Sequence, residues 1–201
     1  MSFHPTVPYG TENWHRSMRA TMPEGDAFTF TKENRDRLEE FASHYAPENR
    51  VSAVLHALYL VQDQQGHITN NAVRHVAQVI GCTTADVEDV VSYYVMFHQQ
   101  PVGKFVLQVC TTLSCALAGA ERVTEALSKE LGLKPGETDA NREFSLLEVE
   151  CLGACDRAPV VGVNDDWHER QQPEAVKALI EGLRAAGAAS LTGCHLKVAG
   201  E

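Results

Sequence analysis

The chain has 201 residues and a formal net charge of −10, from 17 lysines and arginines against 27 aspartates and glutamates. This length is typical of one domain or two small ones, and 44% hydrophobic with 22% charged residues is typical of a globular protein. No stretch approaches the ~20 consecutive apolar residues that span a membrane, so we expect no direct membrane insertion. The excess negative charge is unfavourable beside phosphates, which argues against a nucleic-acid partner.

The N-terminal segment has its own character. Residues 1–30 contain three prolines and no sustained hydrophobic periodicity, which predicts an extended arm laid on a partner or a disordered tail. The start of the chain, Met1-Ser2-Phe3-His4-Pro5, lacks the basic and then apolar pattern of a signal peptide. We therefore expect a cytoplasmic protein. In that reducing compartment, six cysteines are more typical of metal ligands than of disulfides.

Residues 31 to about 97 have the periodicity of helices. Apolar residues recur at i, i+3, i+4 and i+7 in four successive stretches, which can bury one another as a small bundle. These stripes are Leu38, Phe41, Ala42 and Tyr45; Val51, Val54, Leu55 and Leu58; Val73, Val76, Ala77 and Ile80; and Val87, Val90, Val91 and Tyr94. Gly66 and Gly81 predict helix ends, and Thr83 with Asp86 has capping-box spacing. We expect Tyr93, Tyr94 and Phe97 in the core of the bundle.

The periodicity changes after Pro101-Val102-Gly103. Short apolar runs predict strands at 105–109, 145–149 and 160–163, with a hairpin partner at 167–170. Amphipathic patterns predict helices over 116–131 and after Pro173. This order suits a thioredoxin-like α/β layer, so we predict an α+β chain. We divide it into an arm (1–30), a helical bundle (31–100), a thioredoxin-like domain (101–186) and a C-terminal tail (187–201).

Two pairs of cysteines follow predicted strands. Cys110 and Cys115 come after the first strand, and Cys151 and Cys155 after the second. Because neighbouring strands can end at one edge of a sheet, the two loops can bring four sulfurs together. Gly153 permits the tight turn that ligation needs, and helix N-terminal amides near Cys115 favour thiolate charge.

Four thiolates are suitable ligands for zinc or for an iron–sulfur cluster. Structural zinc sites often have two residues between paired cysteines, whereas these pairs have four and three. A 2Fe–2S cluster is larger than one ion, and plant-type ferredoxins include a Cys-x₄-Cys pair. The spacing therefore favours a cluster and leaves zinc open. A thiol–disulfide oxidoreductase is a third hypothesis, although the sequence lacks Cys-x-x-Cys. We expect neither Cys82 nor Cys194 to be a ligand.

Further motifs carry a resemblance that covers about residues 35–183. They are Ser52–Leu55, Tyr59–Gly66, Tyr93-Tyr94, Met96-Phe97, Pro101–Lys104, Val109–Cys115, Gly136–Thr138, Val149–Cys155 and Ala158-Pro159. With them, the chain resembles the E-subunit family of NADH-quinone oxidoreductase, the thioredoxin-like 2Fe–2S ferredoxins of respiratory complex I. The resemblance implies that Cys110, Cys115, Cys151 and Cys155 ligate one 2Fe–2S cluster, and that the chain carries electrons without catalytic residues of its own.

The resemblance also implies partners. FMN and NADH would bind on a partner subunit, and this chain would transfer electrons in the NADH-oxidising module of an NADH:quinone oxidoreductase. Further subunits of the peripheral arm would surround it, on the cytoplasmic side of the inner membrane. The same motifs are similar to small subunits of NAD-linked formate dehydrogenases and of NAD-reducing or bifurcating hydrogenases, which are the alternative. A zinc-stabilised interaction module is a further one.

Overall fold

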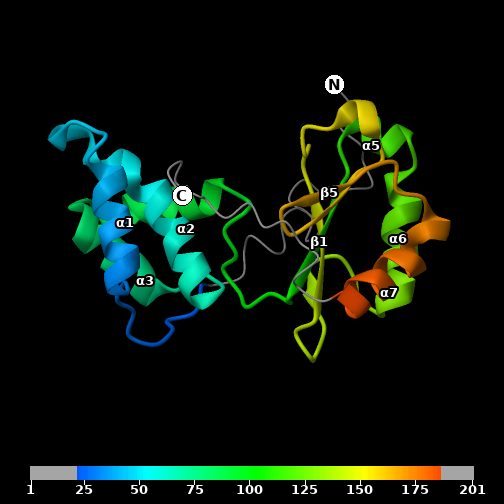
Figure 1. Cartoon of the computed structure of the whole chain (residues 1–201), viewed down its shortest axis with the longest axis horizontal. Helices are drawn as coiled ribbons and strands as arrows, with labels where there is room; N and C mark the ends of the chain where they lie inside the picture. Colours follow the sequence, from blue (N-terminus) through cyan, green and yellow to red (C-terminus); the bar gives the residue numbers. More distant parts are fainter. Residues whose placement is uncertain (1–21, 187–201) are drawn as a thin grey trace, which may run out of the picture. The chain divides into compact units, whose positions relative to one another are not determined.

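The computed structural model describes residues 22–186 and divides the chain into two compact units, Met1–Pro101 and Val102–Glu201 (Figure 1). Each unit has a hydrophobic core of its own. Within residues 22–186, no helix combines the length and the apolar composition needed to cross a bilayer. We describe each unit by itself.

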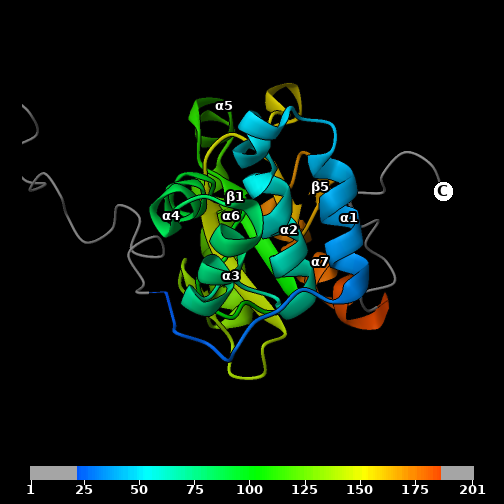
Figure 2. The ribbon, with the colours of Figure 1, turned by 90° about the vertical axis from the view of Figure 1, so that its left-hand side faces the viewer.

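Helices make up most of the described part of the first unit. They are α1 (Lys32–Ala42), the 3₁₀ helix η2 (Pro47–Ala53), α2 (Val54–Gln65), α3 (Asn70–Ile80) and α4 (Thr84–Tyr93). In Figure 2, α2 runs between α1 and α3, and it contacts α1, α3 and α4. Because α2 has neighbours on several sides, most of its apolar residues are buried. The predicted helical bundle is therefore confirmed.

The predicted helix boundaries in this unit rest on specific caps. Gly66 and Gly81 end α2 and α3 in the left-handed conformation, with φ of 84° and 87°, which side chains with a Cβ rarely adopt. At the start of α4, the Asp86 amide donates to the Thr83 hydroxyl, and the Thr83 amide donates to the Asp86 carboxylate. The predicted capping box is thus present with Asp in place of the usual Glu.

Four residues that were predicted in the core of the bundle are exposed: Val51, Tyr45, Tyr93 and Tyr94. Val51 lies in η2 and is 48% exposed, since the α-helical spacing does not apply in a 3₁₀ helix with three residues per turn. Tyr45 follows the end of α1 and is exposed. Tyr93 is 77% exposed because it lies about 200° around α4 from the buried Val91.

Two other aromatic predictions for this region differ in outcome. Tyr94 follows the last residue of α4 in extended conformation and is 37% exposed, so its predicted place in the core is also wrong. Phe97 is 4% exposed and packs edge-on against Tyr59, as predicted for a core residue.

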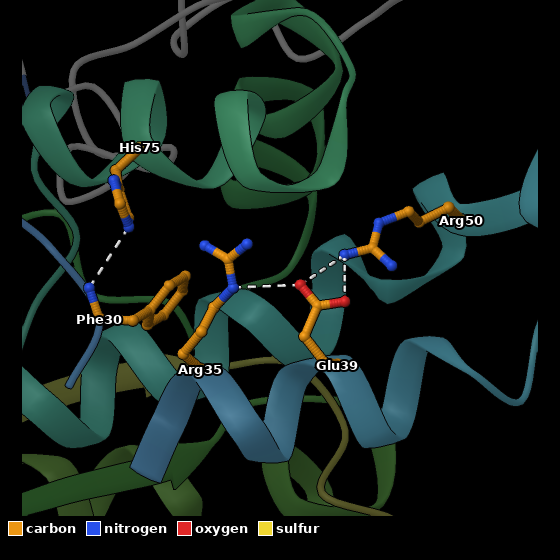
Figure 3. A network of polar contacts seen from close by, with 5 residues as sticks. All are labelled: Phe30, Arg35, Glu39, Arg50 and His75. Atoms are coloured by element: carbon orange, nitrogen blue, oxygen red, sulfur yellow. Dashed lines mark hydrogen bonds and ion pairs between the residues drawn. The ribbon is translucent and has the colours of Figure 1, made fainter. Parts of the chain in front are cut away.

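The described part of the N-terminal arm lies on the helices of its own unit, and the docking of the arm on a partner stays a prediction. Residues 22–30 have no regular secondary structure, yet Phe28 is buried in the core. The Phe30 amide donates to Nε2 of His75 on α3 at 3.3 Å, and the two rings are 5.3 Å apart (Figure 3). This segment therefore belongs to the helical unit, and residues 1–21 lie outside the described part.

A carboxylate links the first two helical elements. Glu39 of α1 accepts from Arg35 one turn earlier at 3.1 Å and from Arg50 of η2 at 2.7 Å (Figure 3). The Arg50 hydrogen bond holds the pKa of Glu39 below its usual range. Because Glu39 and Arg50 remain partly exposed, their ion pair positions η2 against α1 but adds little to the free energy of unfolding.

The second unit is a five-stranded sheet with helices. Its elements are β1 (Phe105–Cys110), α5 (Leu113–Leu117), α6 (Ala120–Leu131), β2 (Glu137–Thr138), β3 (Phe144–Val149), the 3₁₀ helix η3 (Cys155–Arg157), β4 (Val161–Val163), β5 (Asp166–His168), the 3₁₀ helix η4 (Pro173–Ala175) and α7 (Val176–Ala186). The strand order is β2-β3-β1-β4-β5, with β1 parallel to β3 and the other pairs antiparallel. Helices α6 and α7 pack side by side (Figure 1). This is the predicted thioredoxin-like layer.

Some predicted elements of this unit change. The helix expected over 116–131 is two helices, because Gly119 takes a φ of 95° and separates α5 from α6. Strand β2 was not predicted, since two residues carry no alternation and only the pairing with β3 defines it. The hairpin partner spans Asp166–His168 rather than 167–170, after a turn at Asn164 with φ of 53°. The predicted tail at 187–201 lies outside the described residues.

Candidate metal centre

Parallel pairing of β1 with β3 places the two cysteine loops at one edge of the sheet. Cys110 is the last residue of β1 and pairs in register with Val149, the last residue of β3. The Thr111 amide continues the ladder by donating to the Val149 carbonyl at 3.0 Å. Both loops therefore leave the sheet at the same level, as the positions of the cysteines predicted.

The structure places the four predicted cysteines in two pairs at one edge of the sheet. The Sγ atoms of Cys151 and Cys155 are 3.3 Å apart, and Cys110 and Cys115 lie close enough to shift each other's pKa. Cys155 also interacts electrostatically with both Cys110 and Cys115. All four are free thiols. They form two adjacent pairs, Cys110 with Cys115 and Cys151 with Cys155.

The two pairs differ in exposure. Cys110 and Cys115 are each 2% exposed and belong to the hydrophobic core of the sheet unit. Cys151 and Cys155 are exposed. We call Cys110 and Cys115 the inner pair, and Cys151 and Cys155 the outer pair. A group held between them would be half enclosed by protein and open on one side.

The pKa shifts of the cysteines show which neighbouring groups favour or oppose negative charge on each sulfur. Burial acts to raise the pKa of Cys110, but the amides of Thr112 and Leu152 donate to its sulfur and hold the pKa below its usual value. Burial raises the pKa of Cys115, and the charge of Cys110 adds to it. Hydrogen bonding and repulsion from Cys151 raise the pKa of Cys155. Four thiolates therefore repel one another, and a cationic group between them would relieve that repulsion.

The turn between the outer cysteines has the conformation that the sequence predicted. Gly153 has a φ of 84°, and its amide donates to the Sγ of Cys151 at 3.4 Å. A Cβ at Gly153 would lie 4.0 Å from the ring of Trp167, so the backbone angle and not crowding requires glycine. The loop is therefore shaped to direct one amide at a cysteine sulfur.

Contacts with the sheet hold this loop in place. The Leu152 side chain lies against β4, where a Cβ at Gly162 would meet it at 3.5 Å, an ordinary contact distance. Arg157 of η3 forms ion pairs with Asp156 and, at 2.6 Å, with Glu169. The Ala158-Pro159 peptide bond that follows is cis. The ion pair between Arg157 and Glu169 was not evident in the sequence, because it joins residues whose proximity depends on the fold.

Other residues flanking the cysteines have partners of their own. The Glu150 carboxylate accepts from the Thr112 hydroxyl at 3.4 Å, and Asp156 pairs with Arg157. Cys82 lies in the helical unit, packed against that core, where burial raises its pKa. Cys194 lies outside the described residues. Within residues 22–186, no three His, Cys, Asp or Glu side chains form a group that could hold a single metal ion.

Comparison with known proteins defines the class. The family model of the thioredoxin-like [2Fe-2S] ferredoxin matches residues 38–184. The chain belongs to this family.

Relatives with curated names narrow the class. The chain is 40% identical over 158 residues to the E subunit of the NADH-quinone oxidoreductase of Rickettsia bellii, which covers 78% of this chain and 95% of the relative. It is 41% identical over 157 residues to the NADH-quinone oxidoreductase subunit 2 of Thermus thermophilus, covering 78% and 87%. The corresponding E subunit of Escherichia coli is 35% identical over 160 residues, covering 80% and 95%.

A solved structure shares the fold. The NAD⁺-reducing [NiFe]-hydrogenase in the air-oxidized state aligns with a TM-score of 0.57 at 20% identity, over 66% of this chain and 23% of that chain. At this identity the likeness concerns the fold alone.

Proposed function

We propose that this chain is the electron-transfer subunit of an NADH:quinone oxidoreductase and carries one 2Fe–2S cluster in its NADH-oxidising module. The observation that carries the proposal is the pairing of four free cysteines from two loops at one sheet edge. Membership of the ferredoxin family and the relatives named as NADH-quinone oxidoreductase subunits support it. The sulfur donor set suits iron–sulfur chemistry.

The cysteine pairs would share the ligation. Cys110, Cys115, Cys151 and Cys155 would hold the cluster through their four sulfurs. The group supplies a centre that accepts and returns one electron. The amides of Thr112 and Leu152 at Cys110, and of Gly153 at Cys151, donate to ligand sulfurs and offset their negative charge. The protein's part is therefore to hold the sulfurs and stabilise their charge.

A flavin- and NADH-binding subunit of the same complex is the partner we propose. Next to the cysteines, Leu113 and Leu117 of α5 are 71% and 81% exposed, one helical turn apart. Large apolar side chains beside an exposed cysteine pair favour burial against a protein surface. FMN and NADH would bind on that partner, with further peripheral-arm subunits around the pair and the whole assembly peripheral to the inner membrane.

Two alternative functions differ from the proposed one, and a different observation distinguishes each of them from it. A subunit of a NAD-linked formate dehydrogenase or hydrogenase would carry the same cluster, but the curated relatives at 35–41% identity are named NADH-quinone oxidoreductase subunits. Sequencing the partner that co-purifies with this chain distinguishes these assemblies. A zinc-stabilised interaction module would be colourless and lack iron.

The test of the cluster is anaerobic purification of the full chain followed by iron and sulfide analysis and EPR after dithionite reduction. We expect about two irons and two sulfides per chain and a single S = 1/2 signal, as one 2Fe–2S centre requires. The Cys82→Ala variant is the control and should keep both. A colourless chain that retains one zinc ion through mild chelation would contradict the proposal.

A further inference from the structure

A tryptophan on the edge strand lies beside the turn between the outer cysteines. Trp167 is the middle residue of β5, the last strand of the sheet next to β4, and it is 55% exposed. Cη2, at the tip of its ring, lies 4.0 Å from the point where a Cβ of Gly153 would be. The amide of Gly153 donates to the Sγ of Cys151. The ring therefore faces the backbone turn that directs a hydrogen bond at a candidate ligand.

The preceding residue of the loop lies against the strand next to β5. A Cβ at Gly162 of β4 would meet Cδ1 of Leu152 at 3.5 Å. Gly162 and Trp167 are partners in the antiparallel register of β4 and β5, so they lie on the same face of the sheet. Leu152 and Gly153, which are consecutive in the loop, thus lie against two residues that pair across adjacent strands. The loop rests on this pair, with a glycine below Leu152 and an indole beside Gly153.

The indole is on the opposite face from the neighbouring side chains of these strands. Val161 and Val163, which flank Gly162 in β4, are buried in the core of the sheet unit. Since side chains alternate along a strand, Gly162 and its partner Trp167 face the other side, and His168 points away from Trp167. Removing the exposed indole therefore changes the contact with the turn and leaves the buried valines in place.

Loss of iron from the outer pair requires a change at this turn. A bond between iron and the sulfur of Cys151 or Cys155 breaks, an oxygen of water or of a chelator binds the iron instead, and the released thiolate takes a proton from water. Both cysteines are exposed, so water and chelators can reach them. An indole packed beside the turn opposes its opening, because opening exposes apolar surface that the ring and the loop bury together.

We propose that Trp167 is a positioning residue that holds the turn at Gly153 closed on Cys151 and slows the loss of iron from the outer pair. The effect on iron rests on the proposed function. The inference goes beyond that function by naming a side chain that is not a ligand and that limits access to the site. The same contact protects the outer thiols of the metal-free chain, which provides a test that does not require the cluster.

The first experiment follows the loss of visible absorbance after EDTA is added anaerobically to the loaded full chain. We expect Trp167→Ala to lose iron about tenfold faster than the wild type, which corresponds to about 1.4 kcal/mol of lost packing. Trp167→Phe keeps a ring and should recover part of the protection. His168→Ala removes the adjacent ring on the other face and should stay close to the wild-type rate. A wild-type rate in Trp167→Ala, or equal acceleration in His168→Ala, overturns the inference.

The second experiment uses the reduced, metal-free chain in a background of Cys82→Ala and Cys194→Ala. An aromatic disulfide reagent reacts with each thiolate to form a mixed disulfide and releases a coloured thiolate, whose absorbance gives the rate. We expect the exposed outer thiols to react faster in Trp167→Ala than in the parent, and at the parent rate in His168→Ala.

The two experiments distinguish a failure of the inference from a failure of the proposed function. A wild-type chain that purifies without iron overturns the proposed function, and the thiol rates then decide whether Trp167 protects the turn. Equal thiol rates in the parent and in Trp167→Ala overturn the inference, whether or not either chain holds iron. If Trp167→Ala assembles no cluster, a faster thiol reaction in that variant supports the inference.

Discussion

Cys82 in the helical unit and Cys110 in the sheet unit are thiols next to hydrophobic cores, yet their pKa values shift in opposite directions. Burial and the Asp86 carboxylate raise the pKa of Cys82. Burial also acts to raise the pKa of Cys110, but amide hydrogen bonds from Thr112 and Leu152 reverse the shift. Cys82 lies in the loop between α3 and α4, whereas Cys110 ends β1 at the edge where both cysteine loops leave the sheet. The comparison teaches that burial alone does not set the acidity of a thiol, because amide hydrogen bonds outweigh it at Cys110 and not at Cys82.

Removing one thiol from each unit tests most directly whether only the cysteines of the sheet unit hold the cluster. We expect Cys151→Ala to lose nearly all iron and the EPR signal, since three sulfurs leave one iron incompletely ligated. Cys82→Ala should keep full iron and sulfide, because its sulfur only packs against the helical core. Iron and sulfide analysis measures both. Full cluster occupancy in Cys151→Ala would count decisively against the ligand assignment.

Truncating one buried leucine in each core compares the two units by their free energy of unfolding and by their effect on iron retention. Leu60 of α2 and Leu107 of β1 are both fully buried, and truncation to alanine should cost about 2–5 kcal/mol in the free energy of unfolding of the affected unit. Leu107→Ala should also weaken iron retention, because Leu107 lies on the strand that ends at Cys110. Urea unfolding followed by circular dichroism and by visible absorbance tests this. Equal iron loss in Leu60→Ala would contradict it.

A buried histidine adds a pH dependence to the helical unit. His56 is 4% exposed and stacks on Phe41 at 4.1 Å, and its Nε2 has no hydrogen-bond partner among the described residues. Burial lowers the pKa of His56 below its usual 6.5, and Arg37 adds to the effect. The unfolded chain therefore takes up a proton at a higher pH than the folded chain does.

Stability from neutral His56 is thus present above pH 6.5 and is lost as the pH falls below it toward the folded-state pKa. The slope for one proton is at most about 1.4 kcal/mol per pH unit. Urea unfolding at pH 7.5, 6.5 and 5.5 measures it. His56→Phe should remove this part of the pH dependence while retaining the stacking on Phe41. An unchanged pH profile in that variant would refute the role of His56.

The smallest expected effect comes from the surface of the helical unit. Thr83→Ala removes the hydroxyl that caps α4 and should lower the free energy of unfolding by about 1 kcal/mol. Thr83→Ser retains the capping oxygen and should restore most of that loss. Neither variant should change iron content. Chemical unfolding of the three proteins side by side measures the difference, and a Ser variant as unstable as Ala would contradict the capping explanation.

The elements that could be predicted from the sequence are those whose caps and hydrophobic periodicity lie within a few residues of one another. Helices with caps at Gly66, Gly81 and Thr83 were predicted because cap and periodicity lie within a few residues. Val51 and Tyr93 were misplaced because exposure depends on helix type and on which face has a neighbour. The single helix expected over 116–131 failed at Gly119, whose left-handed conformation could have been suspected from the residue type.

By itself, the sequence determined the α+β order of elements, the helical bundle and the four cysteines of the candidate centre, because periodicity, caps and motif spacing are local properties of a chain. The ligand role of those cysteines stays a prediction. Tertiary structure alone decided that Cys110 and Cys115 are buried while Cys151 and Cys155 are exposed. The physical reason is that exposure and hydrogen bonding between loops arise only when strands distant in sequence pair in register.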